Sequence, residues 1–260
     1  MKMPIDSPAA KRARSRFRLR AIPIPVVFYA LVLVLFVLTA IFANVLAPAS
    51  PIRQRLDGRL SPPRWLATEI VPDQPTYLLG SDQLGRDVLS RILYGSRVSL
   101  IVGFAAVCIG GVFGAARGRL AGYVGRKSDD VIMMVADIQL AFPFILLAIA
   151  VIAVLGPSFT NLVVVIGISG WVTYARIARA EVLSIREKEY IEAIRCLGGD
   201  GRRIILRHLL PNALSPLIIV ATLDLARTII LESTLSFLGL GIQPPTPSWG
   251  GMLGEGRQYL

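Results

Sequence analysis

The 260-residue sequence predicts an all-α fold, a polytopic bundle of helices that cross a membrane. Its composition is 54% hydrophobic and only 17% charged, whereas a soluble domain carries about a quarter charged residues. The apolar residues gather in uncharged runs close to the ~20 residues that a helix needs to cross a bilayer. Basic residues flank these runs, the usual topological signal of a membrane protein, so the net charge of +11 requires no nucleic acid.

The N-terminal part is predicted to be a basic tail, one span and an external segment. Residues 1–21 carry seven lysines and arginines against a single acid, Asp6, and are expected to form a disordered cytoplasmic tail. The uncharged run at 26–46 is too long for the core of a signal peptide, so we interpret it as a retained anchor. Residues 22–96 therefore combine the first transmembrane helix with a proline-rich segment, which helix parity places outside the cell.

Four further spans are predicted within residues 97–260. The first of them, at 98–116, places Ala106, Gly110 and Gly114 four residues apart, and such a face lets two helix backbones approach closely. The other spans are expected at 131–155, up to Tyr174 and at 209–231, connected by a basic cytoplasmic loop at 117–128, a turn at 156–161 and a cytoplasmic loop at 176–208.

Aromatic and basic residues end the fourth of the five spans. Trp171 and Tyr174 are followed by Arg176 and Arg179. This order is typical of an aromatic belt with arginine side chains that extend to the headgroups. We therefore expect these four residues at the membrane surface.

Four charged residues fall within the predicted spans. Such groups are costly in a membrane and usually face a bundle interior or a water-filled path. Asp224 and Arg227 are three residues apart on one helical face, so they either neutralise each other as a buried ion pair or line a substrate path. Both interpretations stay open for the whole set: Asp137, Asp224, Arg227 and Glu232.

The segment 184–211 is polar, although apolar spans flank it. Ser184 and Glu187 match a capping box and predict the start of a short amphipathic helix. Gly198 is expected to end this helix in the left-handed conformation, and Asp200 to cap a second helix that enters the membrane. Docking on a partner and resting on lipid headgroups are both compatible with this geometry. The predicted apolar face consists of Ile185, Ile191, Ile194 and Leu197.

The same segment resembles the EAA loop of ABC importer permeases. Ile194 and His208 depart from the motif, whereas the spacing from Glu192 to Pro211 is complete. In that family the loop is a coupling helix that inserts into a cleft of the ATP-hydrolysing subunit. The resemblance therefore implies ATPase coupling by Glu192, Ala193, Arg195, Leu197, Gly198, Leu210 and Pro211.

A second resemblance covers residues 77–260. The stretches LGSDQLGRDVLSRILYGSRVSL, AFP, YIEAIRCLG, RHLLPN and LSFLGLGIQPPTPSWGGML resemble the second permease subunit of dipeptide and oligopeptide ABC importers, a family that includes nickel importers. This resemblance implies a type I ABC importer transmembrane fold. Five spans are visible here up to Leu260, and six are expected for the family.

The implied function is peptide import as half of a translocation path in the cell membrane, with the N-terminus in the cytoplasm. Expected partners are a homologous second permease, two cytoplasmic ATPases, an extracellular binding protein and lipid. ATP and magnesium are expected in the ATPases and no cofactor in this chain, whose GYVGRKS at 122–128 lacks the spacing of a phosphate-binding loop. The alternatives are import of nickel or other small cargo, and a channel or secondary transporter without an ATPase.

A membrane enzyme is disfavoured. The chain has a single histidine, His208, and lacks the H-E-x-x-H and G-x-S-x-G motifs, so no catalytic or metal site is predicted. Cys108 and Cys196 offer no disulfide framework and are expected to be small packing residues.

Overall fold

The computed structural model describes residues 23–66, 77–198 and 200–259, and the predicted tail at 1–21 lies outside these ranges. Within them, regular structure is helical apart from one antiparallel bridge between Ser81 and Asp87, so the all-α prediction is confirmed. The chain divides into two units, 1–36 and 37–260, of which the second contains every element from α2 onward.

The predicted first span at 26–46 is two helices. The apolar helix α1 (Ile24–Ile41) is followed by the single turn α2 (Ala43–Leu46). Phe42 separates them with φ −93° and ψ 15°, outside the ideal α-helical geometry. Neither helix has charged residues, so composition predicts an apolar span here but does not predict the interruption at Phe42.

Helix α3 (Val88–Val124) has 37 residues and is far longer than the span predicted at 98–116. It begins where the Asp87 carboxylate accepts a hydrogen bond from the Ser90 backbone N–H at 2.8 Å, and it ends at Gly125, which has φ +66°. The prediction of a loop at 117–128 is therefore wrong. Packing on α6 carries the helix through Gly118 and Gly122, which are buried against it, and the helix ends only at Gly125.

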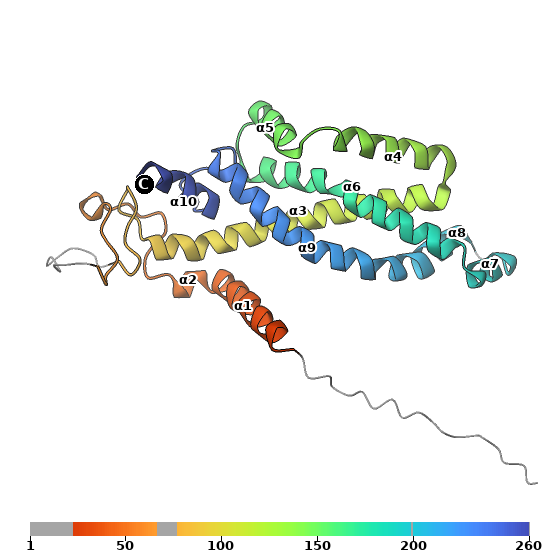
Figure 1. The fold of residues 1–260 in the computed structure, drawn as a ribbon, viewed down its shortest axis with the longest axis horizontal. Helices are drawn as coiled ribbons and strands as arrows, with labels where there is room; N and C mark the ends of the chain where they lie inside the picture. The colour runs from red at the N-terminus through yellow and green to blue at the C-terminus, as the bar shows by residue number, and fades with distance from the viewer. Residues whose placement is uncertain (1–22, 67–76, 199, 260) are drawn as a thin grey trace, which may run out of the picture. The chain divides into compact units, whose positions relative to one another are not determined.

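Small residues allow α3 to pack directly on the backbone of α6 (Phe159–Arg186), and the two helices lie side by side (Figure 1). A Cβ atom added at Gly114 would lie 2.2 Å from the Trp171 carbonyl oxygen, and one at Gly118 would lie 2.1 Å from that of Ala175. The close contact predicted for the glycine face is thus made within this chain. The stripe along α3 consists of Ala106, Gly110, Gly114, Gly118 and Gly122.

The third predicted span, at 131–155, is interrupted. Helices α4 (Arg126–Leu140) and α5 (Phe144–Leu155) meet at 88° around Pro143, which lacks a backbone N–H to continue the ladder. Within the described ranges, four helices are long and apolar enough to cross a membrane, or up to five if this bent pair is one span.

The fourth and fifth spans extend further than predicted. Helix α6 continues past Tyr174 to Arg186, while α9 (Leu210–Phe237) replaces the span expected at 209–231 and contains Pro216. The prediction of an aromatic belt at the membrane surface is also wrong, because Trp171 and Tyr174 are only 2% and 1% exposed and so do not face the surroundings of the protein. Both rings pack inward, since the small residues of α3 leave room for them.

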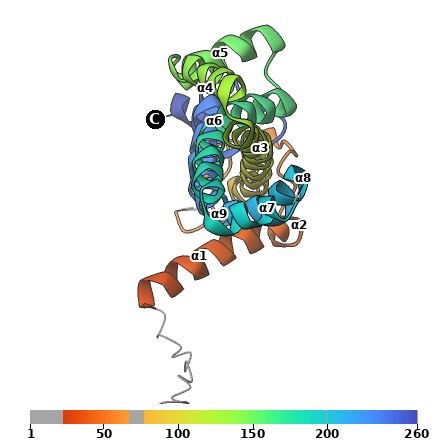
Figure 2. The same cartoon turned by 90° about the vertical axis from the view of Figure 1, so that its right-hand side faces the viewer.

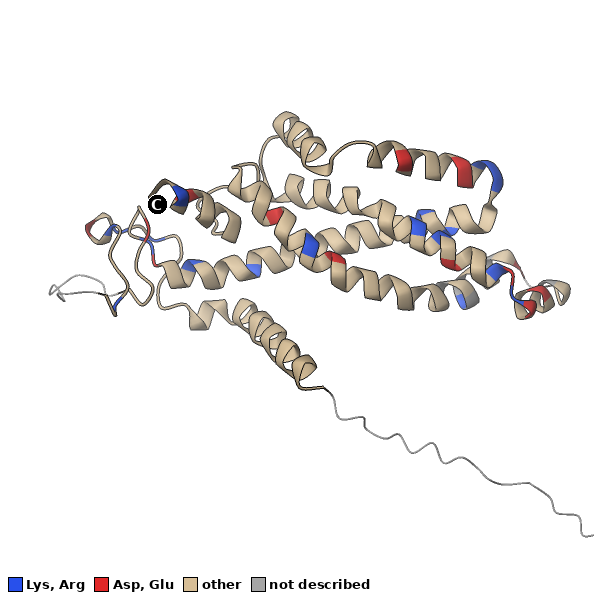
Figure 3. Ribbon diagram, in the orientation of Figure 1, with Lys and Arg blue, Asp and Glu red and all other residues tan. Residues whose placement is uncertain are grey.

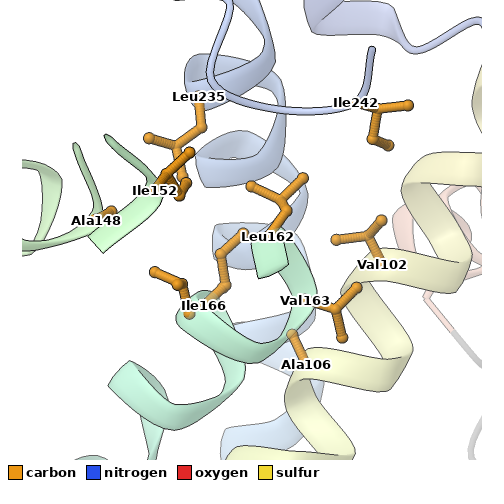
Figure 4. Close-up of a cluster of buried hydrophobic side chains, with 10 residues drawn as sticks. Val102, Ala106, Ala148, Ile152, Leu162, Val163, Ile166, Leu235 and Ile242 are labelled. Atoms are coloured by element: carbon orange, nitrogen blue, oxygen red, sulfur yellow. The ribbon is translucent and has the colours of Figure 1, made fainter. Parts of the chain in front are cut away.

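The main apolar core lies where α3, α5, α6 and α9 converge (Figure 4). Ile152 and Leu162 are fully buried there, and Leu235 of α9 packs beside them. The labelled side chains in Figure 4 come from all four helices and from the chain after α9: Val102, Ala106, Ala148, Ile152, Leu162, Val163, Ile166, Leu235 and Ile242. This core fixes one end of α9 against α3 and α6.

Residues 47–66 and 77–87 form a cap at one end of the bundle that includes the turn η1 (Leu56–Gly58). Buried ion pairs fix the cap to α3 and to α10 (Trp249–Gly256), which precedes the short η3 (Arg257–Tyr259). The carboxylates of Asp82 and Glu255 both accept hydrogen bonds from the guanidinium groups of Arg86 and Arg91, with Glu255 at 2.9 and 2.7 Å from the two arginines.

Burial alone would raise the pKa of the Asp82 carboxyl. Hydrogen bonds from the backbone N–H groups of Arg86 and Leu84, together with the Arg86 and Arg91 guanidinium groups, outweigh burial. The pKa of Asp82 therefore lies below its ordinary value. The ionised carboxylate is the form that holds the cap together.

Candidate coupling segment and intramembrane polar cavity

The cap and the candidate coupling segment lie at opposite ends of the α3, α6 and α9 bundle (Figure 1), and Figure 2 views the bundle from the end that carries α7 and α8. The coupling segment, residues 187–211, comprises α7 (Glu189–Cys196), α8 (Gly201–Ile204), the π-helix η2 (Ile205–Leu209) and the start of α9. Figure 3 shows charged residues at both ends of the molecule, with acidic residues on α7.

The coupling helix begins at Glu189, and the predicted start at Ser184 is wrong. Ser184 and Ile185 belong to the last turn of α6, and Glu187 follows that helix as its C-cap. Val182 and Ile185 are buried in an apolar cluster, so packing extends α6 beyond the point where the capping signal suggested a new start. The chain reverses at Lys188, whose N–H donates to the Ile185 carbonyl at 3.1 Å.

The inner face of α7 is anchored in this apolar cluster. Ile191 is fully buried, and Ile194 packs against it, as the predicted apolar face required. The cluster joins α7 to four other parts of the chain, because Tyr123 comes from the end of α3 and further members come from α6, α8 and η2. Its buried members are Val182, Ile185, Ile191, Ile204 and Leu209.

The outer face of α7 is free for contact. Glu192, Ala193 and Cys196 are exposed, and Leu197 at the end of the helix is 88% exposed. The assignment of Leu197 to the buried face is therefore wrong, because the helix ends at Cys196 and the chain turns outward. The packing role predicted for Cys196 is wrong for the same reason, and Cys108 is exposed on α3.

The turn after α7 has the predicted conformation. Gly198 has φ +79°, the left-handed region that favours glycine, and α8 begins directly after Asp200. Gly201 is needed for a different reason, because an added Cβ atom would lie 2.3 Å from the Tyr123 hydroxyl. Pro211 is exposed in the first turn of α9. The side chains of Arg195 and Leu210, both predicted to act in coupling, lie outside the described residues.

A polar cavity of about 90 Å³ lies between α6, α9 and the break in α4–α5, all of them helices of the candidate spans. Its wall combines apolar side chains of the break, such as Phe142 and Phe144, with polar groups of α4, α6 and α9. The polar and charged residues that line it are Gln139, Ser169, Thr173, Asp224, Arg227 and Thr228.

Asp224 and Arg227 line the same cavity but are not an ion pair. Among the salt bridges of the described residues, none joins them. Asp224 instead accepts a hydrogen bond from the Tyr174 hydroxyl at 3.0 Å, and Arg227 is exposed at the side of α9. The contact that an ion pair between these two residues requires is therefore not formed, and their role in lining a substrate path stays a prediction.

The other two predicted charges lie elsewhere. Glu232 is fully buried between α3 and α9, where its carboxylate accepts hydrogen bonds from Ser99 at 3.0 Å and Ser236 at 2.8 Å. Asp137 is exposed and forms an ion pair with Arg176 at 2.6 Å. Neither lines the cavity. Glu232 has a packing role here, and Asp137 joins the surfaces of α4 and α6.

Sequence reasoning missed Tyr174 and Gln139 as members of this site. Tyr174 precedes Asp224 by 50 residues, and no local pattern predicts that a hydroxyl of α6 reaches a carboxylate of α9. Gln139 accepts a hydrogen bond from the Trp171 indole at 2.6 Å and donates to the Ser169 carbonyl at 2.8 Å. Pro143 was the available signal, because a proline within an apolar run marks a break where backbone lines a cavity.

Comparisons with known proteins agree with this arrangement. Residues 114–257 match the family described as binding-protein-dependent transport system inner membrane component. The di/tripeptide transport system permease protein DppC of Pseudomonas aeruginosa is 42% identical over 230 residues, covering 88% of this chain and 75% of the relative. The dipeptide transport system permease protein DppC of Alkalihalophilus pseudofirmus is 43% identical, with coverage of 86% and 71%.

A solved structure of the MetNI methionine ABC transporter in inward-facing conformations has the same fold. The TM-score is 0.54 at 22% identity, with 66% of this chain and 81% of that chain covered. The predicted transmembrane fold is therefore confirmed. The relatives are transport permeases, in agreement with a transport subunit and not an enzyme.

Proposed function

The chain belongs to the family of binding-protein-dependent transport system inner membrane components and is the permease of an ABC importer, and from this premise we propose that its cargo is dipeptides or short oligopeptides. The names of the relatives at 42% and 43% identity support this cargo. Nickel or another small cargo is the alternative, because the sequence resemblance extends to nickel importers.

The proposed complex contains this chain, a homologous second permease, two cytoplasmic ATPases and an extracellular binding protein. ATP and magnesium are held by the ATPases, and this chain binds no cofactor of its own. The N-terminus and residues 187–211 lie in the cytoplasm, and the cap at 47–66 and 77–87 lies outside. The position of α7 and the cap at opposite ends of the bundle supports this orientation (Figure 1).

One observation carries the coupling role: α7 is buried on one face and exposed on the other. A helix that docks in a groove needs exposed anchors, and Leu197 and Ala193 supply them. It must also be firmly attached to its own chain, and the fully buried Ile191 provides this. Glu192, Ala193, Leu197 and Gly198, with Arg195, Leu210 and Pro211, are the residues we assign to coupling.

Movement of α7 reaches the membrane through packed side chains. Closure of the ATPase pair on ATP would displace α7, and the cluster around Ile191 would carry that displacement to Ile204 and Leu209. These residues precede α9, which lines the polar cavity through Asp224 and Arg227. Access to the path at the permease interface would alternate as α9 shifts.

Native Cys196 allows a direct test, because it is exposed on the outer face of α7. A Cys108→Ser variant leaves Cys196 as the only cysteine. We expect a membrane-impermeant maleimide to label it in inverted membrane vesicles but not in intact spheroplasts. Assembly with the ATPases should protect it, and a bifunctional cross-linker should join it to an ATPase. Labelling from the outside, or labelling unaffected by the ATPases, would contradict the coupling role.

Reconstituted transport identifies the cargo and the energy source. Proteoliposomes with the full complex and binding protein should take up radiolabelled dipeptide only with ATP inside the compartment that holds the ATPases. Uptake of nickel but not dipeptide would favour the alternative cargo. Uptake by the permeases alone would favour a channel or secondary transporter.

A further inference from the structure

Two opposite charges lie one helical turn apart on α9 without neutralising each other. Both line the polar cavity, and the helix from Pro211 to Phe237 that carries them is long and apolar enough to cross a membrane. A charged side chain at the centre of a membrane helix is costly unless it has polar partners. Asp224 and Arg227 therefore need polar counterparts that the apolar face of α9 does not supply.

The hydrogen-bonding capacity of both groups is largely free. Asp224 accepts from Tyr174 through Oδ2, whereas an ionised carboxylate has about four acceptor positions. Arg227 carries five donors on its guanidinium group, and no hydrogen bond or ion pair of this side chain is found among the described residues. Both groups therefore have room for a ligand.

The side-chain amide of Gln139 in the cavity wall already has hydrogen-bond partners. The carbonyl oxygen of Gln139 accepts from Trp171, and its NH₂ group donates to the Ser169 backbone. These bonds hold the Gln139 side chain against α6, so it has little hydrogen-bonding capacity left to bind a ligand. The strong polar groups left in the cavity are thus one carboxylate and one guanidinium, both on α9.

This pair of opposite charges matches a zwitterion. We propose that Asp224 binds the α-ammonium group of a peptide in transit and that Arg227 binds its α-carboxylate. This inference rests on the proposed peptide cargo. Side chains three residues apart on a helix have Cβ atoms about 5–6 Å apart, and a two-residue peptide spans about 7 Å. The guanidinium can also bind a carboxylate through two parallel hydrogen bonds.

The subsite is half of a larger one. A cavity of about 90 Å³ is smaller than the roughly 300 Å³ of a small ligand pocket. Arg227 is exposed at the open side of α9, beside the exposed apolar residues Leu223 and Ile230. The second permease would therefore complete the site by covering this face, and the peptide would pass between the two subunits.

The test compares peptides with free and blocked ends. The full complex is reconstituted, and the binding protein is preloaded to saturation with Ala-Ala, N-acetyl-Ala-Ala or Ala-Ala-amide, so that uptake is measured per loaded binding protein. We expect Asp224→Asn to slow Ala-Ala uptake about tenfold and to leave N-acetyl-Ala-Ala unchanged. Arg227→Gln should slow Ala-Ala similarly and leave Ala-Ala-amide unchanged.

Thr222→Val is the matched control. Thr222 is exposed on α9, outside the cavity, and its hydroxyl donates within its own helix to the Ile219 carbonyl at 2.7 Å. Its replacement should leave uptake of all three peptides unchanged. Asparagine at position 224 can still accept the Tyr174 hydrogen bond, so assembly of that variant should be normal by size exclusion.

Two results would overturn the proposal. Equal slowing of free and blocked peptides would show that the charges support the path without binding peptide ends. Loss of assembly in Asp224→Asn or Arg227→Gln would show that they pair with the second permease. The proposed function stands in both cases if the wild-type complex imports Ala-Ala, and falls if it does not.

Discussion

The turn at Gly198 makes a sharp prediction about coupling. Its φ of +79° lies in the left-handed region, and an added Cβ atom would meet nothing within 4 Å. A substitution there therefore causes no clash, and its cost is that of the backbone alone. For an ordinary L-residue this is about 1–2 kcal/mol, which is a factor of roughly 5–30 in the population of the native turn.

Side chains that tolerate this conformation differently should rank accordingly. Asparagine adopts the left-handed region more readily than alanine, and a β-branched residue is a genuine outlier there. We expect peptide-stimulated ATPase activity and uptake to fall in the order glycine, Asn, Ala, Val at position 198, with Gly198→Val inactive. The eight-residue α7 is too short to be stable alone, so loss of the turn frees the helix.

Gly156 provides a control outside the coupling segment, because its ψ of 152° places it in a region that is essentially restricted to glycine. It has φ +82° with nothing within 4 Å of an added Cβ atom, but it lies in the turn between α5 and α6. Gly156→Ala and Gly156→Val should lower thermal stability while the ATPase activity stays dependent on peptide. Equal uncoupling at both positions would refute the reasoning. So would equal activity of Asn and Val at position 198 in complexes that assemble normally.

Three further predictions concern packing and the cap. Gly114→Ala should destabilise the permease by about 1–3 kcal/mol, because the new Cβ would lie 2.2 Å from a backbone oxygen. Gly111→Ala is the control, because its Cβ would make ordinary contacts at 3.6 Å, and it should not destabilise the permease. Thermal unfolding in detergent measures the stability of both variants. Because the pKa of Asp82 is lowered in the folded protein, its carboxylate contributes fully to the stability of the cap at a pH above the ordinary aspartate pKa, and this contribution is lost as the pH falls through the lower folded-state pKa. The resistance of the cap to protease should therefore drop in acid. Asp82→Asn should remove this pH dependence. Glu232→Leu should cost about 1–3 kcal/mol in thermal unfolding through the serine hydroxyls left without an acceptor, and Glu232→Gln clearly less.

The elements that sequence reasoning predicted correctly depend on local signals. The spans could be predicted from uncharged runs, and the close contact at Gly110 and Gly114 from small residues spaced four positions apart. Helix ends were predicted poorly because tertiary packing decides them. Helix α6 continues to Arg186 since Ile185 is buried in a cluster that also contains residues of α7 and α8, and no window of sequence shows that cluster.

The same distinction applies to the candidate site. Gly198 could be predicted because the left-handed conformation is a property of one residue and its neighbours. The cavity could not, because Gln139, Tyr174 and Asp224 come from three helices and meet only after the chain breaks near Pro143. Helical spacing also left two interpretations open for Asp224 and Arg227, because no local pattern shows that a tyrosine on another helix donates a hydrogen bond to Asp224.

The two contacts of α3 explain which helix can move. Against α6, the glycines of α3 meet backbone atoms, such as the carbonyl oxygen of Ala175 opposite Gly118, and such a contact cannot slide without clash. Against α9, Gly103 meets the flexible ends of Leu225 and Ile229, which can change rotamer. The π-helix at 205–209, an irregular turn of a kind frequent at functional sites, directly precedes α9. Displacement of α7 should therefore shift the first part of α9 over a fixed α3–α6 pair, which moves Arg227 relative to Gln139, while the core around Leu235 holds the other end of α9.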